Sequence, residues 1–128
     1  MVQRPVWLAK FRGSKSQRAH FALFIPNATH ANRNPNDRSA ACKGTIIHVV
    51  GAPMAGYAHE FKRNYDCGAS QDLENLVQIG WVDSEHVADP PTEAYSKDST
   101  AIGRLEIEAL RIPAPRRSEN FMAPVNDT

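Results

Sequence analysis

The sequence predicts an α+β domain, a small antiparallel sheet of about five strands with one helix toward its C-terminal side. Short apolar or alternating segments recur between turn residues, as strands do, while apolar residues at helical spacing occur only near residues 98–112. The length of 128 residues suits one domain of ordinary size. We expect this domain to cover residues 1–115, with a polar tail over residues 116–128.

Five segments are expected to form the strands. In the first segment Trp7, Ala9 and Phe11 share one face. A Gly-Ser turn follows it, and Pro26 ends the second segment because proline cannot donate to a strand ladder. The third segment is apolar on both faces, which predicts a central strand. The fourth alternates only in part, and the fifth follows a short turn; in order, the five are residues 6–12, 19–25, 44–50, 57–65 and 73–82.

The single helix is expected after Asp98-Ser99-Thr100, which offers several N-cap residues. Apolar residues from Ile102 to Ile112 then favour an amphipathic helix of about three turns, interrupted only by Gly103 and stopped by Pro113. On this helix Glu106 and Glu108 are expected to face solvent.

Composition excludes several function classes. The formal net charge of +1, with acids and bases interspersed, gives no basic surface for nucleic acid. No stretch approaches the ~20 apolar residues that span a bilayer, and no signal-peptide core follows Met1, so we expect a cytoplasmic protein. Cys42 and Cys67 fit free thiols. Without Cys-x-x-Cys or zinc-like Cys/His spacing, we expect no metal and no cofactor.

Two histidines stand out because each lies within an apolar strand. If the second and third strands pair antiparallel, His20 and His48 approach each other toward one end of the sheet. Whether they share a face depends on the register, which the sequence leaves open. They could be a base and the group that orients it, or two core histidines with satisfied nitrogens. Adding His59 would make a three-histidine metal set, which only distant spacing supports.

A strand, an Arg12-Gly13 turn, the string His-Phe-Ala-Leu-Phe-Ile (20–25) and then Gly-Thr-Ile-Ile-His-Val (44–49) resemble the opening of the permuted papain-like families. These are the lecithin retinol acyltransferase-like group and the NlpC-type hydrolases. The resemblance implies that His20 is the base and His48 its orienting partner. The chain is also similar to small fungal proteins of unknown function that share the strings His-Phe-Ala-Leu-Phe-Ile-Pro and Ile-His-Val-Val-Gly-Ala-Pro-Met, a likeness that implies no activity.

The sequence departs from these families at the nucleophile. They place the reactive cysteine after the sheet, at the start of a helix, whereas no cysteine follows Cys67. The domain would then be a shortened member of the family, or one whose nucleophile is lost. Of the two cysteines Cys42 is the better substitute, because Lys43 favours its thiolate while Asp66 disfavours that of Cys67.

These observations predict a thiol hydrolase or acyltransferase-like domain that acts on an amide or ester, with His20, His48 and Cys42 as its catalytic residues. Trp7, Phe24 and Tyr57 are expected to line its cleft and contact a small molecule or peptide. The alternatives are a non-catalytic binding module and a non-thiol biosynthetic enzyme with His20 as acid and base. Self-association as a homo-oligomer is also expected, because an incomplete papain-like sheet would leave an apolar face uncovered.

Overall fold

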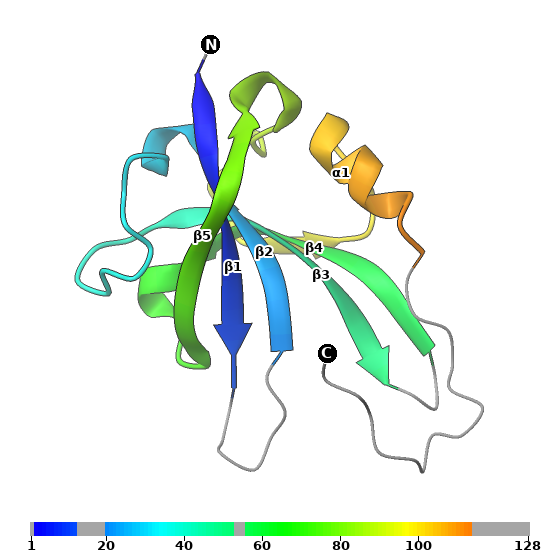
Figure 1. Ribbon diagram of the computed structural model, residues 1–128, viewed down its shortest axis with the longest axis horizontal. Coiled ribbons are helices and arrows are strands. Elements are labelled where there is room, and N and C mark those ends of the chain that lie inside the picture. Colours follow the sequence, from blue (N-terminus) through cyan, green and yellow to red (C-terminus); the bar gives the residue numbers. More distant parts are fainter. Residues whose placement is uncertain (1, 13–19, 53–55, 114–128) are drawn as a thin grey trace.

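The computed structural model describes residues 2–12, 20–52 and 56–113, so the expected tail lies outside it. These residues form a six-stranded antiparallel sheet in the order β5-β1-β2-β3-β4-β6, with one helix (Figure 1). The elements in chain order are β1 (Gln3–Phe11), β2 (His20–Pro26), η1 (Ala28–His30), β3 (Lys43–Ala52), β4 (Gly56–Asp66), η2 (Cys67–Ala69), β5 (Leu73–Asp83), η3 (Ser84–His86), β6 (Ser96–Asp98) and α1 (Arg104–Leu110).

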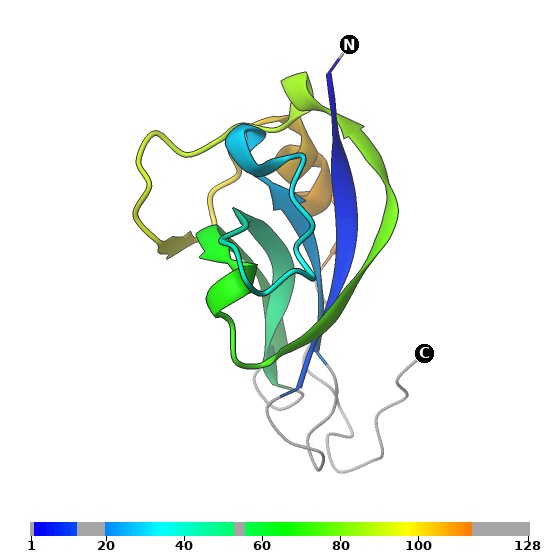
Figure 2. The ribbon, with the colours of Figure 1, turned by 90° about the vertical axis from the view of Figure 1, so that its left-hand side faces the viewer.

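The α+β class and the five predicted strands are confirmed, each strand within a few residues of its expected bounds. The apolar third segment is the inner strand β3, which pairs with β2 on one side and β4 on the other. Strand β5 lies at the edge and pairs with β1, where register shifts at Val6/Trp7 and Lys10/Phe11 interrupt the ladder. Such irregularities bend a strand, and Figure 2 shows β5 curving along β1.

Two expectations near the C-terminal side were wrong. Asp98, expected among the N-cap residues of the helix, instead ends the short edge strand β6 (Ser96–Asp98) beside β4, where no strand was expected. All three residues are exposed polar residues, so they carry no apolar alternation that could announce a strand. The helix is also shorter than predicted, because it begins only after Gly103, whose φ of 80° is incompatible with a helical residue.

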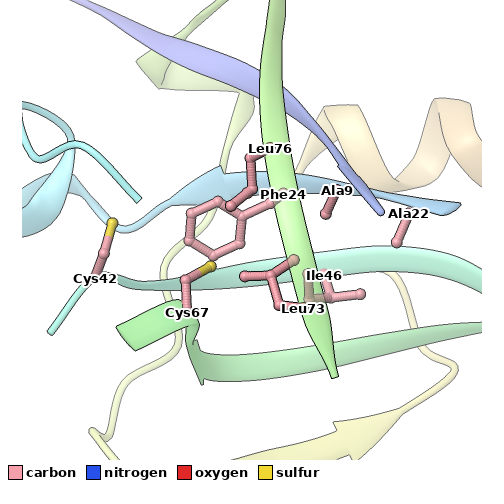
Figure 3. Packing of buried hydrophobic residues seen from close by; sticks show 8 residues of the cluster. All are labelled: Ala9, Ala22, Phe24, Cys42, Ile46, Cys67, Leu73 and Leu76. Carbon is pink, nitrogen blue, oxygen red and sulfur yellow. The ribbon is translucent and has the colours of Figure 1, made fainter. Parts of the chain in front are cut away.

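Each face of the sheet carries its own apolar cluster. On one face, Phe24 and Ile46 pack with the alanines of the inner strands, with Leu73 and Leu76 of the curved β5 and with both cysteines (Figure 3). On the other face, Ile25, Ile47 and Phe61 are covered by Leu105 and Ala109 of α1 and its flanking segment. Inner strands that are buried on both faces explain the continuous apolar runs in their sequence.

A buried ion pair holds α1 against the sheet, which corrects the expected exposure of Glu106. Arg63 and Glu106 are only 2% and 3% exposed, and the Arg63 guanidinium donates to the Glu106 carboxylate, to both oxygens of Asp98 and to the Thr100 carbonyl. Glu106 also accepts from the backbone N–H of Ile102. A buried charge needs such complete partnering. Within the described chain, no helix has the length and apolar character to cross a bilayer.

Candidate functional site

The two histidines meet where β2 and β3 separate. Backbone pairing joins these strands only from Leu23–Ile47 to Pro26–Gly44, and Figure 1 shows them diverging beyond that ladder. Across the widening gap, Nε2 of His20 lies 2.8 Å from Nδ1 of His48. The register therefore places both rings on one face, the alternative that the sequence left open, and a side-chain hydrogen bond continues where the backbone ladder stops.

Glu60 extends this pair into a chain of three groups. It is the cross-strand partner of His48 on β4, and its Oε1 lies 2.9 Å from His48 Nε2. A carboxylate only accepts, so in neutral His48 the proton sits on Nε2 and Nδ1 is a bare acceptor. His20 must then donate from Nε2, which leaves a lone pair on its Nδ1. That atom has no hydrogen-bond partner among the residues described.

The surroundings keep both histidines neutral near pH 7. His48 is buried at 7% exposure, whereas His20 is exposed. Burial lowers the pKa of both rings, and the positive charge of Lys62 lowers both further. The hydrogen bond that His48 donates to Glu60 raises the pKa of His48, but less than burial lowers it. A neutral His20 with a free lone pair is the form that can accept a proton.

An apolar pocket of about 360 Å³ adjoins the histidine pair at the divergence of β2 and β3. Its volume falls within the range of small-molecule sites. Besides the two histidines, it is lined by Leu8, Phe21, Ala22, Leu23, Ile47, Val49 and Tyr57. The pocket is open to solvent, and Phe21 in its wall is half-exposed. A ligand with an apolar group would therefore bind next to both histidine residues.

The predicted binding residues separate into two groups. Tyr57 lines this pocket, as expected. Phe24 is fully buried in the core cluster (Figure 3). The partly buried Trp7 packs against the same cluster. These two side chains therefore hold β1 and β2 together and do not line the pocket beside His20.

The structure does not bring Cys42 to the histidines. Cys42 precedes β3 and lies six residues from His48 along an extended chain, a separation of roughly 20 Å. It is 1% exposed, and burial raises its pKa to about 11, which overrides the opposing charge of Arg33. Cys67 is fully buried in the same cluster (Figure 3), and burial raises its pKa further. Thiols in this state are inert.

Glu60 was missed at the sequence level, although a signal for it exists. The break between Gly51 and Gly56 predicts a turn between the third and fourth segments. Counting three residues back from Gly51 and three forward from its partner Tyr57 reaches His48 and Glu60. A hairpin register read from that break would have paired the two side chains.

The other histidines of the strands and of η3 take no part in the hydrogen-bonded chain Glu60–His48–His20, which we call the histidine relay. His59 lies within hydrogen-bond distance, 2.7 Å, of the Ile112 carbonyl, and His86 lies in η3. No group of three or more metal-binding side chains occurs in the parts of the chain that the structure describes.

The chain belongs to a protein family of unknown function, DUF6540, whose family model matches residues 6–127. No curated protein and no solved structure matches it.

Proposed function

We propose that this protein is an acid–base enzyme that cleaves an ester or amide, with His20 as general base and no covalent thiol intermediate. One observation carries the proposal: the hydrogen-bonded chain Glu60–His48–His20, whose two histidines also line an apolar pocket, ends on a ring nitrogen with no hydrogen-bond partner among the described residues. Such a chain orients a base and stabilises its protonated form without moving a proton along it.

In the proposed reaction, His20 Nδ1 takes a proton from water while the water oxygen bonds to the substrate carbonyl carbon. The resulting imidazolium keeps its Nε2–H bond to His48, which in turn donates to Glu60. When the tetrahedral intermediate collapses, His20 returns the proton to the leaving oxygen or nitrogen. The same residue takes up the proton and returns it, so the reaction requires no cysteine.

Lys62 is the proposed source of positive charge at this site. Its register partner is Ile46, so it projects from β4 on the same face as His48 and Glu60. Its charge reaches both histidine rings, because it lowers the pKa of each. A fixed cation near the base also favours negative charge that develops on a carbonyl oxygen during attack.

Kinship with the permuted papain-like families is part of the proposal. Adjacent antiparallel strands carry the base and its orienting group, as that resemblance implies. The buried state of both cysteines supports a version of such a domain in which activated water replaces the thiol.

A small-molecule binding module is the second candidate, because the pocket wall beside the histidines is mostly apolar. In that case the histidine chain would fix the gap between β2 and β3 and perform no chemistry. Wild-type protein would then enhance the fluorescence of an apolar probe such as N-phenylnaphthylamine, yet show no turnover above the buffer rate.

The test of catalysis is hydrolysis of p-nitrophenyl acetate, butyrate and octanoate by parallel preparations of wild type, His20→Ala and the control His86→Ala. Loss of a positioned base should lower kcat/KM by about 100-fold or more, whereas removal of the η3 histidine should have no effect. Added imidazole should restore part of the rate of His20→Ala. Equal rates for wild type and His20→Ala would refute the proposal.

A further inference from the structure

A second pocket, of about 430 Å³, lies at the opposite end of β3 from the histidine relay. Three regions of the chain build it: the loop between β2 and β3, the end of β4, and the Pro90-Pro91 segment before β6. In Figure 2 this end of the sheet carries the two long connections. None of its lining residues belongs to the relay or to the apolar pocket.

The walls of this pocket are fixed by buried polar side chains. Asn64, 5% exposed, adopts the left-handed region with φ of 56°, and its Nδ2 donates to the carbonyls of Thr92 and Ala94 at 2.8 and 2.9 Å. Its Oδ1 accepts from Asn27 at 2.9 Å. A strained residue that ties two loops together indicates a preformed cavity.

A second tie involves the pocket residue Asp89. One of its oxygens accepts from the Arg4 guanidinium at 2.6 Å, and the other accepts from the backbone N–H of Ala28 at 3.2 Å. Arg4 is itself buried and also donates to the Pro26 carbonyl. Because Arg4 neutralises Asp89, this carboxylate adds little negative charge to the pocket.

The other polar groups that line the pocket are mainly hydrogen-bond donors and cations. The backbone N–H of Lys43 donates to His30 Nδ1 at 2.8 Å, so neutral His30 carries its proton on Nε2. Arg33 is anchored by one N–H to the Ala41 carbonyl, and Lys43 lines the pocket beside it. After burial, Arg33 and Lys43 are the strongest influences on the His30 pKa and lower it, outweighing Asp66 and Glu93.

One acceptor in the pocket wall is unused. The amide of Asn64 donates to two carbonyls, so its oxygen must face the NH₂ of Asn27, and this fixes the orientation of both amides. Asn27 Oδ1 is then left buried with no hydrogen-bond partner among the described residues. This oxygen is closed to solvent, so it belongs to the packing of the wall and does not contact a ligand in the pocket.

We propose that this pocket binds a small phosphate monoester. Arg33 and Lys43 hold the phosphate through charge-assisted hydrogen bonds, as these side chains do elsewhere. The Nε2–H of His30 donates to a third phosphate oxygen. Glu93 opposes the phosphate and sets an upper limit on affinity.

The test uses glycerol 3-phosphate as the probe, with glycerol and inorganic phosphate for comparison. Binding to the full chain is measured by calorimetry and by NMR of His30. We expect saturable binding that raises the pKa of His30, weaker binding of inorganic phosphate, and none of glycerol. Arg33→Gln and Lys43→Gln should each weaken binding about tenfold, the loss of one charge-assisted bond. The control Arg104→Gln removes a cation outside the pocket and should change nothing.

Glu93 provides a test of opposite sign, because Glu93→Gln should tighten the binding of glycerol 3-phosphate several-fold. Absence of saturable binding up to about 10 mM glycerol 3-phosphate would overturn the proposal, as would equal weakening by Arg104→Gln. Inorganic phosphate that binds as tightly as glycerol 3-phosphate would overturn the assignment of a monoester as the ligand.

Discussion

The two ends of β3 carry two pockets of opposite character. At the His48 end, β2 and β3 separate, the wall is apolar, and one line of polar groups ends on a nitrogen with no partner among the described residues. At the Lys43 end, polar side chains cross-link two loops, and most of their hydrogen-bonding atoms are filled. A nitrogen without a hydrogen-bond partner next to an apolar cavity can act as a base. A network of side chains that hydrogen-bond to one another holds a polar pocket in a fixed shape, which favours the binding of a polar ligand.

The largest expected effect comes from breaking the relay in its middle. His48→Phe keeps an aromatic ring between β2 and β3 but leaves His20 without its acceptor. Ester hydrolysis should fall by about 100-fold or more, because a base in the wrong tautomer is inactive. Glycerol 3-phosphate binding at the other end should remain. His86→Phe is the matched control, and a fully active His48→Phe enzyme would remove the functional difference between the two ends.

At the polar end the expected effect is on stability. Asn64→Ala removes buried hydrogen bonds to two carbonyls and keeps a side chain at positive φ, so the free energy of unfolding should fall by about 3 kcal/mol. Asn64→Gly should lose about 1 kcal/mol less, because glycine tolerates this conformation. Urea denaturation measures both variants. Equal stabilities of the alanine and glycine variants would show that the backbone at residue 64 is not strained.

Glu60→Gln should reduce kcat/KM by about tenfold, since the hydrogen bond persists but the negative charge that stabilises a protonated relay is gone. Glu60 raises the pKa of His48. Its neutralisation should lower the pKa of His48 and weaken the support that His48 gives to protonated His20, which moves the acidic limb of the pH–rate profile to lower pH. A limb that stays in place would mean that Glu60 does not act on the base.

The smallest effect is expected for Lys62→Met. The Lys62 charge lowers the pKa of both His20 and His48, so its removal should move the acidic limb to higher pH, the opposite of Glu60→Gln. The maximal rate should fall only a few-fold if Lys62 stabilises charge on the carbonyl oxygen from a distance. Lys97→Met on β6 is the control, and a shift of the limb to lower pH would contradict the assignment.

Much of the fold was predictable because apolar periodicity marks strands, and the approach of His20 to His48 follows from antiparallel pairing alone. The shared face of the two rings, the role of Glu60 and the strand β6 depend on register and on tertiary ion pairs, which one sequence does not contain. Cys42 looked activated beside Lys43, but burial decides its pKa. The polar pocket joins segments about sixty residues apart, a proximity that no local pattern marks.

Self-association and papain-like kinship stay predictions. The exposed apolar side chains Val77, Ile79 and Trp81 on the edge strand β5 are where a second copy would be expected to pack.

The central claim is that the hydrogen-bond chain from Glu60 leaves Nδ1 of His20 as a free base. Long-range ¹H–¹⁵N correlation spectra of the ¹⁵N-labelled protein at neutral pH report directly which ring nitrogen carries the proton. We predict the Nε2–H form for both His20 and His48, with Nδ1 of each unprotonated. A spectrum with the His20 proton on Nδ1, or with both rings doubly protonated at pH 7, would contradict it.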